Sequence, residues 1–222
     1  MSTGKHYQMF DILGPIMVGP SSSHTAGACR LANMARRIYG APLRKVICEL
    51  HGSFSHTYRG HGSDRAVAGG LLGLAPDDER LVDAIRLIAD KGIDLTFTPK
   101  DLGNVHPNTM RFRFIAPDEP EFTVTGSSIG GGNIRITDID GTATDFTGEY
   151  PTLILRYPDS PGMVYAASGI CHDNNLNIAH MHVNRLDQTA TMIIELDEPF
   201  TPRVTDAFQK LPQLDFFKAI AR

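Results

Sequence analysis

Five consecutive residues with small or polar side chains could bind a ligand: Ser21, Ser22, Ser23, His24 and Thr25, in the stretch VGPSSSHTAGACR of residues 18–30. A predicted helix begins here. Free backbone N–H groups and hydroxyls therefore lie together, a combination that can hold a carboxylate or a phosphate. Simple capping also favours serine and threonine at a helix start. Because three serines and a histidine exceed what one cap requires, we predict a ligand site.

Two further histidines lie in polar, loop-like sequence. His61 is in GHGSDRA and His106 is in HPNTMRF. Each is either a candidate general base near neutral pH or simply a solvated side chain. A glycine-rich run, GSSIGGG at residues 126–132, would let the backbone approach a ligand closely, although a hairpin or a bulge explains glycines equally well.

Other kinds of chemistry have weaker support. His180 and His182 alternate on a predicted strand and would share one face, but no third metal ligand is evident, which favours a structural or surface role. A hydrolase built on Ser23 and His24 lacks triad geometry and a GxSxG motif. The lone GxG in GHGSD is not a dinucleotide-binding fingerprint.

The composition limits the class of protein. The chain has 222 residues, 41% of them hydrophobic, and a formal net charge of −4, which argues against a nucleic-acid-binding surface. Every apolar run is shorter than the roughly 18 residues of a membrane span, and the N-terminus is unlike a signal peptide. Three widely spaced cysteines, Cys29, Cys48 and Cys171, suggest neither a disulfide framework nor a metal site. We therefore expect a soluble, cytoplasmic protein.

The pattern of the first part of the chain predicts an α+β domain over about residues 5–140. Apolar residues at helical spacing predict a helix from Thr25 to Gly40, and a polar loop over 51–64 should supply Ser63 or Asp64 as the cap of the next helix. A further helix is predicted over 76–92. The predicted strands are 44–50, 93–99, 110–116, 121–126 and 133–139, with residues 126–132 joining the last two.

A change of composition at residues 138–151 predicts a linker to a second domain over 150–222. The expected order there is βαββαβ, the ferredoxin-like arrangement: strand 152–156, helix 161–173, strand 177–185, strand 190–196, helix 202–210 and strand 213–219. The turn PDSPG before the first helix, and Asn177 with Ile178 at the next strand, resemble an ACT domain, a small amino-acid-sensing module.

Taken together, the motifs GPSSSHTAGACR, GHGSDRA, HPNTMRF and GSSIGGG, followed by an ACT-like tail, resemble the beta chain of iron–sulfur-dependent L-serine dehydratase. The resemblance implies removal of water from L-serine, giving pyruvate and ammonia, without pyridoxal phosphate. It also implies a [4Fe–4S] cluster that acts as a Lewis acid and is held by the cysteines of a separate alpha subunit. No metal ligand is then expected in this chain.

The resemblance also implies roles for individual residues. His24, His61 and His106 are candidate bases, with His61 the first choice, or else they line an effector site. The expected substrate-binding residues are Ser21, Ser22, Ser23, Thr25, Asn108, Ser128, Gly130 and Gly131. In the ACT-like domain, Asp159, Gly162 and Asn177 are expected to bind an effector, and open sheet edges suggest a homodimer. The alternatives are a purely regulatory amino-acid-binding module and a self-sufficient hydrolase or metal enzyme, for which no complete ligand set is present.

Overall fold

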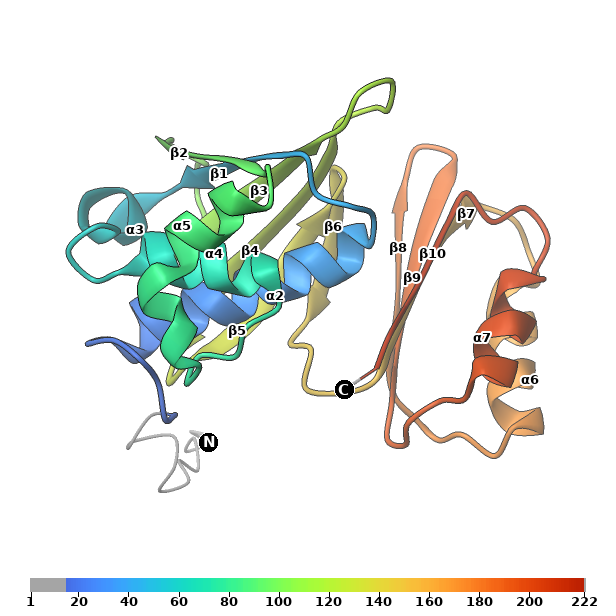
Figure 1. Cartoon of the computed structure of the whole chain (residues 1–222). Coiled ribbons are helices and arrows are strands. Elements are labelled where there is room, and N and C mark those ends of the chain that lie inside the picture. Colours follow the sequence, from blue (N-terminus) through green and yellow to red (C-terminus); the bar gives the residue numbers. More distant parts are fainter. Residues whose placement is uncertain (1–14, 222) are drawn as a thin grey trace, which may run out of the picture. The chain divides into compact units, whose positions relative to one another are not determined.

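The computed structural model describes residues 15–221, and its internal contacts divide the chain after Arg135 into two units. The described residues form helices and two sheets, one of six strands and one of four. Figure 1 shows these elements along the chain. The predicted α+β class is therefore confirmed. Among the residues described, no helix has the length and apolar character that a membrane span requires.

The first sheet has the strand order β2-β1-β3-β4-β5-β6, in which β1 runs parallel to β2 and antiparallel to β3. Alternating apolar residues set the register of the β1–β3 pair, because the buried Phe112 lies opposite the buried Cys48 and Met110 opposite Leu50. The strands are Lys45–Leu50 (β1), Asp94–Pro99 (β2), Thr109–Ile115 (β3), Phe122–Gly130 (β4), Asn133–Ile139 (β5) and Thr142–Phe146 (β6).

Helices cover one face of this sheet (Figure 1). A π-helical turn, Ser22–Ala26, leads into α2, Gly27–Tyr39, which packs on β3, on β4 and on α4, Ser63–Leu72. The predicted apolar stripe of α2 is buried, and Gly40 ends the helix in the left-handed conformation, as expected. The remaining helices are α3 at Gly52–Thr57, a 3-10 turn at Glu79–Asp83 and α5 at Ala84–Asp90.

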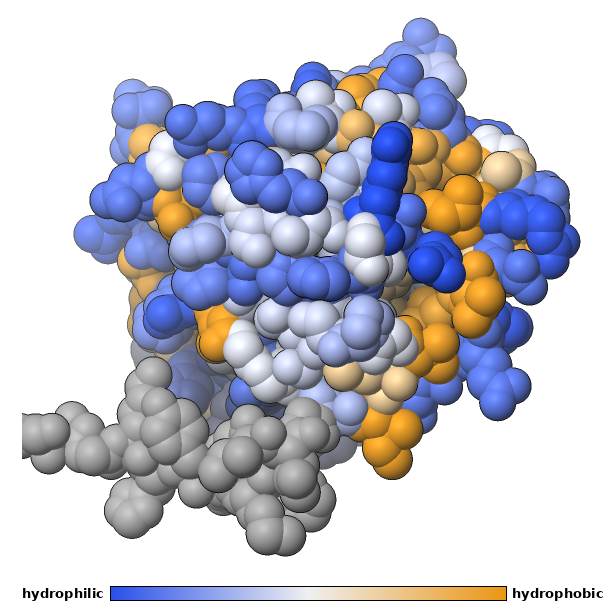
Figure 2. All heavy atoms as spheres, turned by 90° about the vertical axis from the view of Figure 1, so that its left-hand side faces the viewer, coloured by the Kyte–Doolittle hydropathy of each residue, from blue (hydrophilic) through white to orange (hydrophobic). Residues whose placement is uncertain are grey.

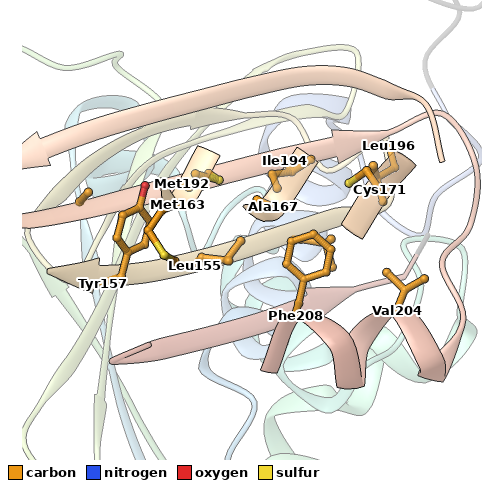
Figure 3. Close-up of a cluster of buried hydrophobic side chains, with 12 residues drawn as sticks. Leu155, Tyr157, Met163, Ala167, Cys171, Met192, Ile194, Leu196, Val204 and Phe208 are labelled. Atoms are coloured by element: carbon orange, nitrogen blue, oxygen red, sulfur yellow. The ribbon is translucent and has the colours of Figure 1, made fainter. Parts of the chain in front are cut away.

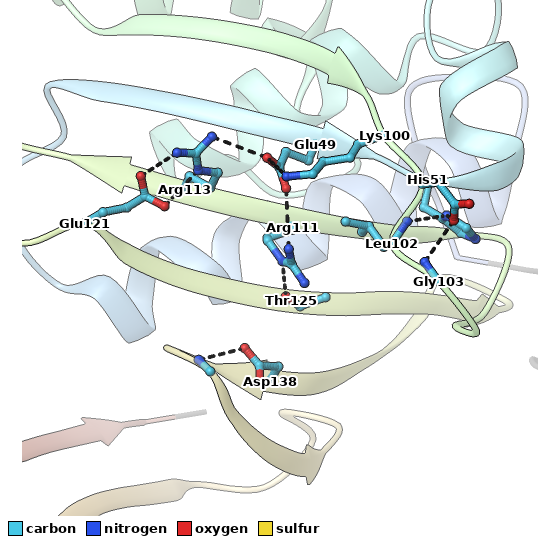
Figure 4. Close-up of polar contacts among 12 residues, drawn as sticks. Glu49, His51, Lys100, Leu102, Gly103, Arg111, Arg113, Glu121, Thr125 and Asp138 are labelled. Carbon is cyan, nitrogen blue, oxygen red and sulfur yellow. Dashed lines mark hydrogen bonds and ion pairs between the residues drawn. The ribbon is translucent and has the colours of Figure 1, made fainter.

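The other face of the same sheet carries charge. Successive strand residues alternate in direction, so Glu49 points away from the core side of its neighbour Cys48. Its buried carboxylate lies 2.6 Å from the Lys100 ammonium and 3.4 Å from the Arg113 guanidinium, as Figure 4 shows. Arg111 is 3.7 Å away. Because these cations surround it, the buried carboxylate is not left unpaired.

Four local expectations for the first 151 residues are corrected by the structure. Residues 51–64 are not all loop, since α3 forms there around the buried side chain of Phe54. Gly62, not Ser63 or Asp64, caps α4, in a left-handed conformation that suits glycine. Gly126–Gly130 belongs to β4, so only the residues after it form the connection to β5. The expected linker contains β6, whose alternate residues Thr142, Thr144 and Phe146 are buried.

The part of the second unit from Thr152 to Ile220 has the predicted βαββαβ order. Its sheet is antiparallel with the strand order β10-β7-β9-β8, and both helices pack against it. Figure 3 shows the core, in which Leu155 and Ile194 from the sheet meet Ala167 from α6 and Phe208 from α7. The elements are Thr152–Pro158 (β7), Met163–Asp173 (α6), Ile178–Leu186 (β8), Thr189–Leu196 (β9), Pro202–Gln209 (α7) and Phe216–Ile220 (β10).

Candidate functional site

The five residues Ser21–Thr25, here called the serine run, form the wide turn at the start of α2. Ser21 acts as a cap, because its Oγ accepts a hydrogen bond of 3.2 Å from the backbone N–H of His24. The N–H of Gly27 donates to the carbonyl of Ser22, which gives this segment its π-helical form. π-helical turns of this kind are often found at functional sites. Part of the run is thus ordinary capping, but its geometry is unusual.

His24 is buried at the centre of a hydrogen-bonded cluster. Its Nδ1 lies 2.9 Å from the Ser23 hydroxyl and its Nε2 lies 2.9 Å from the Ser53 hydroxyl of α3. The ring also meets the edges of Phe54 and His61, with centroids 4.9 and 5.0 Å away. Burial, and secondarily the proximity of His61, lower the pKa of His24. The lowered pKa favours the neutral form of His24, and each ring nitrogen lies within hydrogen-bond distance of a serine hydroxyl.

Hydrogen bonds between side chain and backbone connect this turn to the segment that carries His61. The Thr25 hydroxyl donates to the carbonyl of His61 at 3.1 Å, and the Ser63 hydroxyl donates to the carbonyl of His24 at 2.6 Å. Within residues 15–221, the buried Nδ1 of His61 has no hydrogen-bond partner. The start of α4 and the start of α2 are thus held together, with His61 in contact with His24.

A pocket of about 250 Å³ adjoins the two helix starts. Thr25, His61 and Arg65 supply its polar side chains, and Leu81 and Val82 supply apolar side chains. The remaining lining residues are Val18, Gly19, Pro20, Gly60, Gly62 and Ala66. The pocket therefore combines an imidazole, a hydroxyl and a guanidinium in a space that suits a small polar molecule.

The loop that carries His106 lies beside the same cluster. The Pro107 carbonyl accepts a hydrogen bond of 2.9 Å from the N–H of Ser53, and the Asn108 carbonyl accepts one of 2.9 Å from the N–H of Ser128. The side chain of His106 is exposed, and its Nδ1 accepts from the N–H of Asn108 at 3.1 Å. The structure thus places the loop backbone near the cluster but gives the His106 ring no contact with His24 or His61 in the part of the chain it describes.

The glycine-rich run contacts the start of α2 from the sheet side. A Cβ added at Gly27 would lie only 2.1 Å from the Ser128 Oγ, so helix and strand touch there. The carbonyl of Gly132 accepts a hydrogen bond of 2.9 Å from Arg30. Gly130 and Gly131 have φ values of 105° and 61°, which side-chain-bearing residues rarely adopt, and they turn the chain toward β5.

Comparison with known proteins agrees with these motifs. The family model described as "Serine dehydratase beta chain" matches residues 8–92. The chain is 44% identical over 204 residues to the "L-serine dehydratase, beta chain" of Peptoniphilus asaccharolyticus, covering 90% of this chain and 92% of that protein. The chain belongs to the serine dehydratase beta-chain family.

Two further relatives show how the family varies in length. The "Probable L-serine dehydratase, beta chain" of Bacillus subtilis (strain 168) is 40% identical over 212 residues, with 95% of this chain and 96% of that protein covered. The "L-serine dehydratase" of Streptomyces coelicolor is 33% identical over 181 residues, which cover 69% of this chain but only 38% of the longer protein. The beta chain thus matches a part of a longer dehydratase.

Sequence reasoning missed three residues of this candidate site. Ser53 and Ser63 bond to His24 from positions 29 and 39 residues further along the chain, and Arg65 lines the pocket. The available signal was that Ser63 and Arg65 lie within the motif GHGSDRA and that Ser53 lies in the polar segment 51–64. Nothing in their local pattern indicates the partner, because each contact depends on how α2, α3 and α4 pack.

The thiols of this beta chain do not form a ligand set for an iron–sulfur cluster. Cys29, Cys48 and Cys171 are all free and buried. Burial raises the pKa of Cys29 to about 12 and that of Cys171 to about 11, and it also raises the pKa of Cys48. Cluster ligands are thiolates that share one metal site, so these three residues do not fit. Among residues 15–221, no group of three or more His, Cys, Asp or Glu side chains could hold a metal ion.

The expected effector residues of the second unit fall at two ends of one helix. Asp159 and Gly162 precede α6, and Gly162 is its left-handed N-cap, whereas Asn177 follows the end of α6. Asp159 pairs with Arg185 at 3.1 Å, and Asn177 donates a hydrogen bond of 2.5 Å to Asp197. An α-helix of 11 residues is roughly 16 Å long. Within one chain, Asp159 and Gly162 therefore lie at one end of α6 and Asn177 at the other, so the three residues do not line one pocket.

Proposed function

We propose that this chain is the beta subunit of a heteromeric L-serine dehydratase and is active only with an alpha subunit that carries a [4Fe–4S] cluster. Two relatives over 90% or more of this chain have names that include "L-serine dehydratase, beta chain". A longer relative named "L-serine dehydratase" contains the matching region as 38% of its length. The buried thiols of this chain support placing the cluster in a partner.

The observation that carries the proposal is the contact between His24 and His61 next to the pocket. Elimination of a β-hydroxyl from an amino acid needs a base for the proton on Cα and a Lewis acid for the leaving hydroxyl. The cluster, when bound to the partner, supplies the Lewis acid. In this chain His61 lines the pocket and accepts the Cα proton. Burial lowers the pKa of His24, which favours its neutral form beside His61, and the Ser23 and Ser53 hydroxyls contact its two ring nitrogens.

Further parts of the proposal concern assembly and regulation. Exposed apolar side chains such as Val82 and Ile85 are available to a partner subunit, and Figure 2 shows apolar residues gathered on one side of the face that it draws. The βαββαβ unit, which resembles an ACT domain, would form a homodimer and bind a small amino acid. Free, unpaired cysteines suit the reducing cytoplasm, where we place the enzyme.

Anaerobic co-expression with the alpha subunit tests the proposal, with pyruvate formation from L-serine as the readout. The wild-type pair should be active and the beta chain alone inactive. His61→Asn should lower kcat by roughly a hundredfold or more, the usual contribution of a general base, while His106→Asn serves as the matched control and leaves kcat nearly unchanged.

A different result would favour the alternative of a regulatory module. If His61→Asn kept full kcat and altered only the dependence on serine concentration, the pocket would be an effector site. A beta chain that formed pyruvate alone, without the alpha subunit, would contradict the heteromeric proposal.

A further inference from the structure

Arg65 lines the pocket beside His61 and has no acidic partner among residues 15–221. Arg65 lies in the first turn of α4, and its guanidinium folds back toward Gly62, so that a Cβ added there would be 3.8 Å from it. Asp64 uses its carboxylate on the backbone N–H of Arg65. In the described part of the chain, residues 15–221, the guanidinium makes no ion pair or hydrogen bond.

Two other arginines of the first unit, Arg30 and Arg113, are engaged by protein groups. Arg30 donates to the carbonyl of Gly132 at 2.9 Å, and Arg113 holds Glu121 with hydrogen bonds of 2.8 and 2.6 Å. A guanidinium has five donors arranged as a planar fork that matches a carboxylate. Arg65, at the edge of a concave site and near a helix N-terminus, is thus an available donor set for an anion.

The hydroxyls of the serine run are largely used within the turn itself. Ser21 accepts from the N–H of His24, Ser23 contacts the His24 ring, and Thr25 donates to the carbonyl of His61. A carboxylate bound by these hydroxyls would have to displace hydrogen bonds that hold the two helix starts together. Arg65 can bind one without any such loss.

We propose that Arg65 anchors the carboxylate of a small amino acid in this pocket, with His61 facing the rest of the molecule. This inference rests on the proposed function and specifies which residue binds the substrate carboxylate. Leu81 and Val82 form an apolar side of the pocket, and its volume is about 250 Å³. The site therefore has room for a small amino acid such as L-serine.

Calorimetric titration of the full-length chain with L-serine and with L-serinamide, which lacks the carboxylate, tests the anchor. Wild type should bind L-serine and bind L-serinamide far more weakly. Arg65→Ala should weaken L-serine binding roughly ten- to hundredfold, because hydrogen bonds to charged groups are lost. Arg65→Lys keeps the charge but not the planar fork of donors, so its affinity for L-serine should lie between those of wild type and Arg65→Ala. Arg203→Ala, at an exposed arginine of α7, is the matched control and should bind like wild type.

Several outcomes would overturn the inference: no binding of L-serine by wild type, equal binding of L-serinamide, or unchanged binding by Arg65→Ala. The complex with the alpha subunit separates this inference from the proposed function. If Arg65→Ala kept its KM for serine while His61→Asn abolished turnover, the anchor would be wrong and the proposed function would stand. If the complex formed no pyruvate while the Arg65 variants still lost serine binding, the proposed function would fail and the anchor would stand.

Discussion

Replacing Gly27 by alanine should destabilise the protein, although the same change normally stabilises a helix. Gly27 has φ of −62°, an ordinary helical value, so alanine would gain up to about 1 kcal/mol from helix propensity alone. The added Cβ, however, would lie 2.1 Å from the Ser128 Oγ and 2.8 Å from its Cβ. Both residues are buried, so α2 or β4 must move, and overpacking of this kind costs about 1–3 kcal/mol. We expect a net loss of about 1–2 kcal/mol.

A double-mutant cycle identifies the cause. Ser128→Gly removes both atoms that the new methyl group would meet, so Gly27→Ala should cost much less in that background. Gly169→Ala in α6 is the matched control, since a Cβ there meets nothing within 4 Å and should stabilise by up to about 1 kcal/mol.

Urea unfolding followed by circular dichroism gives the free energies. Pulsed alkylation of Cys29 and of Cys171 assigns each transition to the first or the second unit, because both thiols are buried in the folded chain. If Gly27→Ala were as stable as wild type or more stable, or if Ser128→Gly did not reduce its cost, the close approach of α2 and β4 would be refuted.

Three further predictions concern titratable groups. The pKa of His24 is lowered from 6.5, so the folded state binds fewer protons and the unfolding free energy should fall as pH drops below about 6.5; His24→Gln should flatten this slope, and an unchanged slope would contradict the assignment. Burial raises the pKa of Glu195 above 4.5, so its stabilising effect is lost as pH rises through the raised value. Glu195→Gln should therefore melt a few degrees higher at pH 8, about 2–4 °C per kcal/mol, and an equal or lower Tm would show that the ionised carboxylate is not costly. Cys29, Cys48 and Cys171 should react with iodoacetamide on the order of a hundredfold more slowly than a free thiol, and rapid labelling of any one under native conditions would disprove its burial.

Elements whose pattern repeats along the chain could be predicted from the sequence. The stripe of Ala28, Leu31, Ala35 and Ile38 determines the buried face of α2 whatever surrounds it, and the alternation in the second unit gives its βαββαβ order in the same way. Periodicity is a local property. The spacing of apolar residues along the chain stays the same whatever core the element packs against. The predictions that rest on this spacing were therefore confirmed.

The elements without a repeating pattern could not be predicted. In α3 only Phe54 is buried, and the N–H groups of Ser53 and Phe54 bond to the carbonyls of Pro107 and His51. The partner of the Ser63 hydroxyl, the His24 carbonyl, is likewise fixed by the packing of α4 on α2. Residue types in the motifs predict a site at this place, whereas the hydrogen bonds found there depend on contacts between distant segments.

The π-helical turn at Ser22–Ala26 determines the direction of the residues before α2 without determining how α2 itself packs. Its hydrogen bond from Gly27 to Ser22 encloses one residue more than an α-helical turn does. Deleting one residue here would restore ordinary helical phase and rotate everything upstream by about 100° around the axis of α2. The apolar face of α2, which follows the turn, would still pack against β4 and α4. Insertion or loss of a single residue at this turn would therefore redirect the serine run and break the hydrogen bonds from Thr25 to His61 and from Ser63 to His24, while the apolar stripe of α2 stays in register.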